Sequence, residues 1–173
     1  ALKGRRHDKP FVLLVSDRAM AEQQGLAFNA AADALARAFW PGPLSLVLPG
    51  GGGRLPDRLR GPEGGIAVRW TSHAAIAMLV AALGEPLTST SANRPGDAPG
   101  AGAEAIARDF ADAVGDGRLL VLDGGVLGNR PPSTVVDCTA LPARLVREGA
   151  IPLAELRRAA GGRAPGAGRA RSV

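Results

Sequence analysis

Short runs of mostly apolar residues recur along the chain with little polar alternation. An unbroken apolar run of a few residues is typical of a strand that is buried on both faces of its sheet. The pattern therefore predicts strands at Phe11–Val15, Leu44–Leu48, Ile66–Val68, Leu119–Leu122 and Thr134–Val136.

Between these runs, apolar residues recur three and four positions apart, which is the spacing of an amphipathic helix. Glycines stand where two of the helices should end, and a Trp-Pro-Gly-Pro sequence stops a third. The predicted helices are Asn29–Phe39, His73–Leu83, one marked by Ile106, Phe110 and Val114, and Leu153–Ala159. Alternating strands and helices predict an α/β fold, a mixed sheet with flanking helices.

Two stretches have the composition of loops, Gly50–Gly53 and Arg94–Gly102. The glycine run is not a phosphate-binding P-loop, because no Lys-Ser or Lys-Thr pair follows it.

Positive charge is concentrated at the end of the chain. The 173 residues carry a net charge of +5, and five arginines with no acid among them lie beyond Glu155. The remaining 16 basic residues balance the 16 acidic ones, so residues 1–156 are neutral overall. We expect one domain over 1–156 and a basic, low-complexity, disordered tail over 157–173. Such a tail adds at most weak, salt-sensitive affinity for RNA.

The single cysteine, Cys138, has no partner for a disulfide and no His or Cys neighbour at metal-ligand spacing. We therefore expect no structural metal and a reducing compartment, the cytoplasm. No apolar run approaches the roughly 18 residues that a membrane span requires.

Two polar clusters flank predicted strands. Lys3–Lys9 holds four cations just before the first strand, which suits a polyphosphate or carboxylate ligand. For an isolated run of basic residues, a solvated charged loop is the commoner alternative. Thr88–Asn93 holds five hydroxyl or amide residues, and ligands of open α/β sheets tend to lie at strand ends. A turn that satisfies its own backbone is the alternative for this second cluster.

Three further polar features stand at strand ends. Ser133 and Thr134 open one predicted strand, Arg69 closes another, and Arg147 follows the apolar pair Leu145-Val146. Each arginine either reaches into a cleft or pairs with an acid at the surface.

Taken in order, six blocks resemble the signatures of the YrdC-like threonylcarbamoyladenylate synthase family, in its short, single-domain form. The resemblance covers roughly residues 2–152. The blocks are Lys3-Gly4-Arg5 with Lys9-Pro10, Trp40-Pro41-Gly42-Pro43, Ala67-Val68-Arg69 with His73, Ser89-Thr90-Ser91-Ala92-Asn93, Pro132-Ser133-Thr134-Val135-Val136-Asp137 and Val146-Arg147-Glu148-Gly149.

The resemblance implies a twisted α/β fold with a concave, positively lined cleft. It implies that L-threonine, bicarbonate and ATP, with Mg²⁺, yield threonylcarbamoyl-AMP and pyrophosphate. Other proteins then transfer the threonylcarbamoyl group to adenosine 37 of tRNA. This chemistry depends on positioning and electrostatics and needs no protein nucleophile.

Roles are implied residue by residue. Lys3 and Arg5 would act at the phosphates and the carboxylated threonine, while Arg69 and Ser133 are candidates for threonine binding. His73 is expected to cap its helix. The candidates for ATP binding are Ser89, Ser91, Asn93 and Arg147.

The family normally carries a strand, a helix and a Thr/Tyr/Gly-rich segment before its Lys-x-Arg block, whereas Lys3 here is almost the first residue. We expect an exposed sheet edge and an incomplete pocket to follow. Two alternatives stay open, a paralogue that handles carbamoyl adenylate and a non-catalytic RNA-binding module. The neutral body and the scarcity of aromatics count against the second.

Overall fold

The structure, a computed structural model, describes residues 11–94, 97, 102–126, 128, 130–161 and 166–167. The predicted site residues Lys3 and Arg5 lie outside these ranges. Residues 90–130 form one compact unit, and the remaining described residues form another. Each unit is described by itself.

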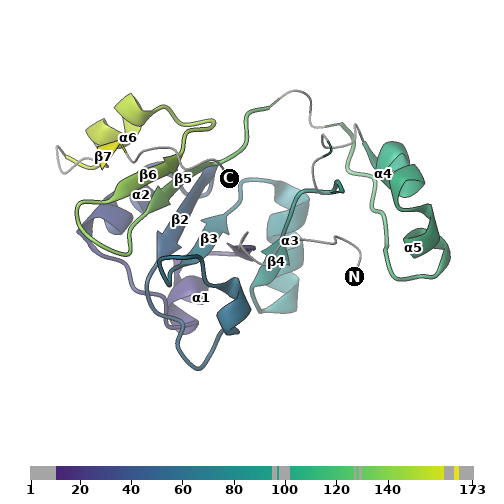
Figure 1. Ribbon diagram of the computed structural model, residues 1–173, viewed down its shortest axis with the longest axis horizontal. Helices are drawn as coiled ribbons and strands as arrows, with labels where there is room; N and C mark the ends of the chain where they lie inside the picture. The colour runs from purple at the N-terminus through teal and green to yellow at the C-terminus, as the bar shows by residue number, and fades with distance from the viewer. Residues whose placement is uncertain are drawn as a thin grey trace. The chain divides into compact units, whose positions relative to one another are not determined.

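The larger unit is built on a mixed sheet in the order β4-β1-β3-β2-β5-β6-β7 (Figure 1). Parallel pairs (β1 with β3, β2 with β5, β6 with β7) alternate with antiparallel ones. The strands are β1 (Val12–Val15), β2 (Leu44–Leu48), β3 (Ile66–Trp70), β4 (Leu87–Ser89), β5 (Thr134–Asp137), β6 (Arg144–Arg147) and β7 (Gly166–Ala167).

Helices connect and cover the strands: α1 and α3 contact β1, while α2 contacts β2 and α6. Asp17 begins α1 by accepting a hydrogen bond from the backbone N–H of Met20, and Asn29 does the same for α2. The elements are α1 (Arg18–Gln23), α2 (Ala30–Phe39), the 3₁₀ turn η1 (Asp57–Leu59), α3 (Ala74–Leu83), α4 (Ala103–Asp109), α5 (Ala111–Gly115) and α6 (Leu153–Ala159).

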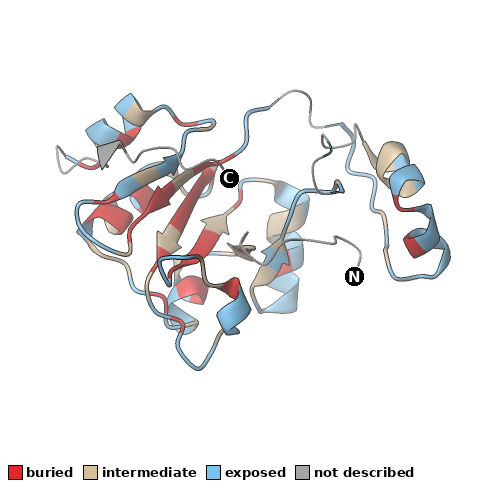
Figure 2. Ribbon diagram, in the orientation of Figure 1, coloured by how far each residue is buried: buried red, intermediate tan, exposed pale blue. Residues whose placement is uncertain are grey.

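The core lies where the central strands meet the helices. Leu44, Leu46 and Leu48 of β2 are completely buried, as is Leu35 of α2. Figure 2 shows this burial concentrated in β2, β3 and β5. No helix in the described part of the chain is both long and apolar enough to cross a membrane. The predicted α/β fold, a mixed sheet with flanking helices, is confirmed.

Two predictions within residues 90–130 are wrong. Leu119–Leu122 forms no strand, because it pairs with no other strand among the described residues. Leu120 and Leu122 are 87% and 88% exposed. The helix predicted through Phe110 is two short helices instead. Phe110, with φ of −120°, breaks the helix between α4 and α5, and its ring lies 5.6 Å below the guanidinium of Arg94.

At the other end, the boundary predicted at residue 156 falls inside a helix. Arg157 and Arg158, assigned to the tail, lie on α6, and Gly166–Ala167 adds β7 to the sheet. The remaining residues of the predicted tail beyond 161 lie outside the described part, so the disorder of that tail stays a prediction.

Candidate functional site

Strand register places predicted site residues on one face of the sheet. Ser89 of β4 pairs with Val12, and Arg69 of β3 pairs with Leu14, two residues further along β1. Paired residues, and residues two apart on one strand, point to the same face. Ser89 and Arg69 therefore share a face.

The same face continues across the next two strands. Leu46 of β2 pairs with Val68 of β3, so their neighbours Ser45 and Arg69 both point to the opposite face from that pair. Ser45 pairs in turn with Val135 of β5. Neighbouring strands lie about 4.8 Å apart, so Ser45 and Arg69 are close neighbours.

A chain of hydrogen bonds completes this face. Arg147 of β6 pairs with Val135. Its Nη2 lies 2.8 Å from the carbonyl oxygen of Ser133 and 3.3 Å from the Ser133 hydroxyl. The Ser133 Oγ lies 3.0 Å from the Oγ of Ser45, which is completely buried. Arg147, Ser133 and Ser45 thus form one linked group.

Thr134 ties the following loop to this group. Its hydroxyl donates to the carbonyl of Ile151 at 2.8 Å and accepts from the backbone N–H groups of Gly149 and Ile151. One donor and two acceptors exhaust what a hydroxyl offers. Thr134 therefore acts as a structural clamp, and Ser133 is the hydroxyl of the pair that faces the candidate site.

Gly149 is required where this loop meets the start of β5. A Cβ at position 149 would stand 2.8 Å from the carbonyl carbon and oxygen of Ser133 and closer still to the carbonyl of Pro132. Only glycine permits that approach.

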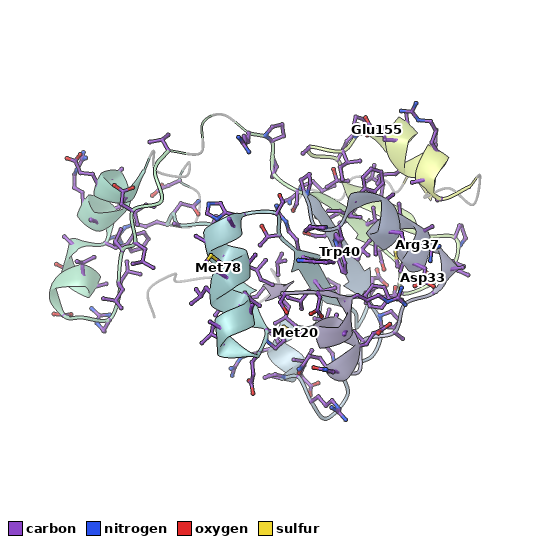
Figure 3. The ribbon with its side chains drawn as sticks, turned by 180° about the vertical axis from the view of Figure 1, so that it is seen from behind. Met20, Asp33, Arg37, Trp40, Met78 and Glu155 are labelled. Atoms are coloured by element: carbon purple, nitrogen blue, oxygen red, sulfur yellow. The ribbon has the colours of Figure 1, made fainter. Side chains whose placement is uncertain are left out.

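Arg69 lies on the side of Ser45 away from Arg147, and its guanidinium is held by a backbone carbonyl. Its Nε donates to the carbonyl of Gly42 at 2.9 Å, in the Trp40–Pro43 block that follows α2. Figure 3 shows Trp40 at the end of that helix. Burial of the Arg69 guanidinium lowers its pKa from the usual value. Arg69 is thus a partly desolvated cation held in place by a neutral carbonyl.

The two arginines of this face have no carboxylate partner among the residues that the structure describes. Within the described residues, no ion pair involves Arg69 or Arg147. By contrast, Arg144, at the other end of β6, pairs with Asp137 at 3.0 Å and with Glu63 at 3.5 Å. Cations left without acids beside buried hydroxyls form a set of donors that suits an anionic ligand.

Ser91 and Asn93 belong to the other compact unit, so they are not part of this described group. The side-chain amide of Asn93 donates to the carbonyl of Asp97 at 2.6 Å, which folds the loop back on itself. Their predicted role in nucleotide binding stays a prediction, as does that of Lys3 and Arg5.

His73 stands at the N-terminal end of α3, but its side chain makes no capping hydrogen bond, so the expectation that it caps the helix is wrong. Its Nδ1 is buried and finds no hydrogen-bond partner within the described part of the chain. Its backbone N–H donates to the hydroxyl of Thr71 instead.

Sequence reasoning missed Ser45. The signal was a single hydroxyl inside an otherwise apolar strand, Leu44–Leu48. Such a residue attracts no notice until the fold brings Ser133, 88 positions away, against it.

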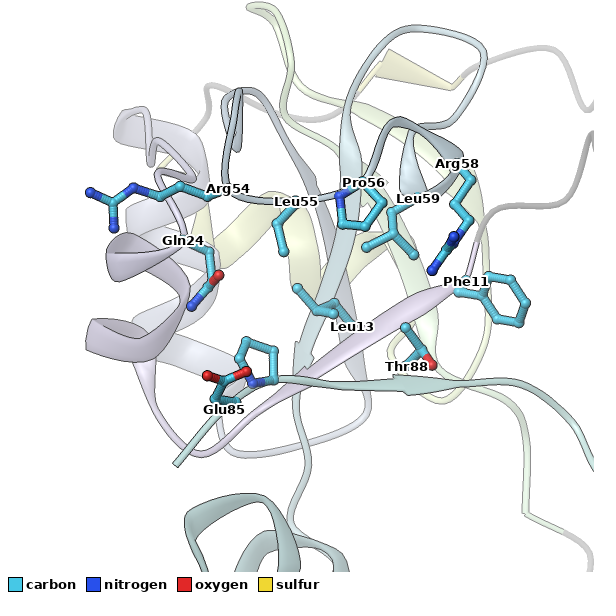
Figure 4. A pocket seen from close by; sticks show the side chains of 11 residues that line it. Phe11, Leu13, Gln24, Arg54, Leu55, Pro56, Arg58, Leu59, Glu85 and Thr88 are labelled. Atoms are coloured by element: carbon cyan, nitrogen blue, oxygen red, sulfur yellow. The ribbon is translucent and has the colours of Figure 1, made fainter. Parts of the chain in front are cut away.

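A separate pocket of about 400 Å³ lies on the other face of the sheet (Figure 4). Leu13 lines it, and Leu13 alternates with Leu14, the register partner of Arg69. Figure 4 shows Leu13, Leu55 and Leu59 in its apolar interior and Arg58 extending toward Phe11. None of the predicted site residues that the structure describes lines it, so we assign the site to the arginine face.

In the described part of the chain, no group of three or more His, Cys, Asp or Glu residues is placed to hold a metal ion. The donor set of the arginine face consists of cations and hydroxyls, which suits anions and not a metal.

Comparison with known proteins agrees with these features. A family model described as telomere recombination, which covers Sua5, YciO and YrdC proteins, matches residues 1–149. A threonylcarbamoyl-AMP synthase of Pyrococcus abyssi is 32% identical over 159 residues, which is 92% of this chain and 45% of the relative. One of Chromobacterium violaceum is 36% identical over 79% of this chain and 68% of the relative.

The crystal structure of P. abyssi Sua5 complexed with L-threonine is similar with a TM-score of 0.81 and 30% identity. The match covers 95% of this chain and 52% of that one. The chain therefore spans about half the length of the Pyrococcus proteins that it matches.

Proposed function

Because the chain belongs to the family of Sua5, YciO and YrdC proteins, we propose that it is a nucleotidyltransferase that makes threonylcarbamoyl-AMP. Its substrates are L-threonine, bicarbonate and ATP, and its second product is pyrophosphate. The relatives from Pyrococcus and Chromobacterium carry the name of this activity.

The observation that carries the proposal is that Arg69 and Arg147, on either side of Ser45 and Ser133, make no ion pair with any described acid. Carboxylate and phosphate oxygens only accept hydrogen bonds, so a surface of donors recognises both. Threonine presents a carboxylate and ATP presents phosphates. A site that binds both substrates therefore needs a surface of hydrogen-bond donors.

The reaction proceeds in two steps. The threonine amine forms a bond to the carbon of bicarbonate, and water leaves. A carbamate oxygen then attacks the α-phosphorus of ATP, and the bond to the β-phosphate oxygen breaks with its electron pair departing on pyrophosphate. Fixed cations stabilise the charge that develops on the leaving group, and fixed donors hold the reactants in line.

The residues divide by the ligand they contact. Arg147 holds phosphate, and Arg69 and Ser133 hold the threonine carboxylate. Partly desolvated Arg69 attracts an anion more strongly than a fully hydrated cation does. The nucleotide and the carboxylated threonine take their remaining contacts from Ser89, Ser91, Asn93, Lys3 and Arg5.

Magnesium enters with ATP as part of the substrate. Mg²⁺ bound by nucleotide phosphates needs few protein ligands. The product passes to transferase proteins that modify tRNA in the cytoplasm. An unpaired, buried Cys138 supports a reducing compartment.

The test is pyrophosphate release from ATP and bicarbonate, with and without L-threonine. We expect release that depends on threonine and that falls at least tenfold in Arg69→Ala, because a charge-assisted contact is lost. Arg37→Ala is the matched control. Arg37 is an exposed arginine on α2 (Figure 3), and its loss should leave the rate unchanged.

Other outcomes separate the alternatives. Pyrophosphate release that needs carbamoyl phosphate in place of threonine would indicate the carbamoyl-adenylate paralogue. RNA binding that persists without residues 162–173, a deletion that leaves α6 intact, in a chain that binds no ATP, would indicate the RNA-binding module.

A further inference from the structure

Ser45 and Ser133 share one hydrogen bond whose direction is fixed by their surroundings. Their Oγ atoms lie 3.0 Å apart, and either could supply the proton. Ser45 is completely buried on β2, and Ser133 is the only partner of its hydroxyl among the described residues. If Ser45 accepted, its own proton would be buried with no acceptor, which is costly. Ser45 therefore donates to Ser133.

Arg147 supplies a second donor to the same oxygen. Its Nη2 lies 3.3 Å from the Ser133 Oγ, and a guanidinium can only donate. A hydroxyl oxygen accepts two hydrogen bonds and donates one. With both acceptor positions occupied by Ser45 and Arg147, the Ser133 proton must point elsewhere. No hydrogen bond among the described residues takes that proton, and 9% of the Ser133 surface is exposed, so we assign a ligand as its acceptor.

We infer that Ser45 is a positioning residue that makes Ser133 a fixed donor to an anionic oxygen of the substrate, a carboxylate or a phosphate. Ser45 itself never reaches the ligand, because it has no exposed surface. It acts only through Ser133. The inference rests on the proposed function. It adds Ser45 as a residue that makes the site select a ligand atom able to accept a hydrogen bond from Ser133.

The same arrangement of donors predicts that a positively charged group is excluded beside Ser133. An ammonium group, which can only donate, would meet three donors around the Ser133 oxygen and find no acceptor. The hydroxyl pair thus favours binding by the carboxylate end of an amino acid over binding by its amine.

The experiment is a double-mutant cycle read by calorimetric titration of the whole chain. Wild type, Ser45→Ala, Ser133→Ala and the double variant are titrated separately with L-threonine and with inorganic pyrophosphate. We expect Ser45→Ala to weaken the binding of one of the two ligands about fivefold, the value of one ordinary hydrogen bond. Ser133→Ala should weaken the binding of the same ligand at least as much. A loss for L-threonine agrees with the proposed role of Ser133 at the threonine carboxylate, whereas a loss for pyrophosphate would assign this donor to a phosphate.

The decisive arm is the double variant, whose affinity should equal that of Ser133→Ala alone. Equal losses from Ser45→Ala with and without Ser133 would mean a general structural effect and would overturn the inference. So would unchanged or tighter binding in Ser45→Ala, since that result means that Ser133 was donating to Ser45.

Two further controls keep the result separate from folding and from the proposed function. Ser45→Thr keeps the hydroxyl and should restore binding, and thermal unfolding of each variant checks its fold. Binding of neither ligand by the wild-type chain would overturn the inference. Binding without threonine-dependent pyrophosphate release would count against the proposed function alone.

Discussion

Arg147 holds the backbone carbonyl of Ser133 with two guanidinium nitrogens, Nε at 3.3 Å and Nη2 at 2.8 Å. Strand β6 thereby fixes the segment that enters β5, at the point where the site hydroxyl stands. A lysine ammonium could not reproduce the contact of two fixed nitrogens with this carbonyl. The two-nitrogen contact is therefore specific to arginine.

Arg147→Lys tests this contact. Lysine keeps the charge but reaches Ser133 with one ammonium, so the contact of two nitrogens with the carbonyl is lost. We expect threonine-dependent pyrophosphate release to fall about tenfold to a hundredfold, the value of a hydrogen bond to a charged group. Initial rates at saturating and limiting ATP would measure the change.

Arg144→Lys is the matched control on the same strand. Arg144 contacts Asp137 and Glu63 and none of the residues of the arginine face, so its replacement should leave the rate within twofold. Equal losses in the two variants would show that β6 needs arginine for its fold and not for the site.

Gly149→Ala tests the close approach behind Ser133. The added methyl group would overlap the Pro132 and Ser133 backbone, which must shift to make room. We expect a loss of about 1–3 kcal/mol in the free energy of unfolding, together with reduced pyrophosphate release. Urea unfolding measures the first quantity.

Gly52→Ala serves as the comparison, because a Cβ at position 52 meets nothing within 4 Å. It should change stability by less than about 0.5 kcal/mol. A Gly149 variant as stable as the Gly52 variant would show that the loop can move freely, and would contradict the packing argument.

Periodicity alone located the central strands and the long helices, because burial on both faces leaves an unbroken apolar signature. Leu44–Leu48 is predicted and observed with the same bounds. Strand β6 was not predicted as a strand, because it begins and ends with exposed arginines and so lacks that signature. Leu119–Leu122 carries the signature without the partner strand that would make it a strand.

The candidate site was predictable in part. Arg69, Ser133 and Arg147 stand at strand ends in the sequence, and the structure brings them to one face of the sheet. Ser45 could not be found, since its importance arises from a contact across 88 positions. The local pattern of apolar and polar residues indicates how a residue packs. The identity of its hydrogen-bond partner depends instead on the register between strands that are distant in the sequence.

Asp137→Asn tests the contacts of the Asp137 carboxylate with Thr139 and Arg144 at the end of β5. Burial raises the pKa of the Asp137 carboxyl, but hydrogen bonds from Thr139 and Arg144 outweigh it and hold that pKa below the usual 3.8. A lowered folded-state pKa stabilises the fold above the unfolded value, and that stability is lost as pH falls through the folded pKa. The variant should be less stable by about 1–3 kcal/mol at pH 7.

The difference between the Asp137 variant and the wild type should shrink as pH falls below 3.8, where the unfolded-state carboxyl becomes protonated, and should be lost once pH passes the lower pKa of the folded state. Urea unfolding at a series of pH values measures it. A difference that stays constant down to the lowest accessible pH would show that the carboxylate charge contributes nothing.

Cys138 should resist alkylation as long as the chain is folded. Burial, assisted by the negative charge of Asp137, raises the pKa of its thiol to about 12. Only the thiolate is an effective nucleophile, so at pH 8 almost none of the reactive form is present. We expect iodoacetamide to leave the native chain unmodified for hours and to modify it within minutes in urea, where the thiol regains its ordinary pKa. Intact-mass measurement over time follows both reactions. Rapid modification of the native chain would mean that β5 and its surroundings open readily, since a thiolate at this position can form only when the local structure is lost.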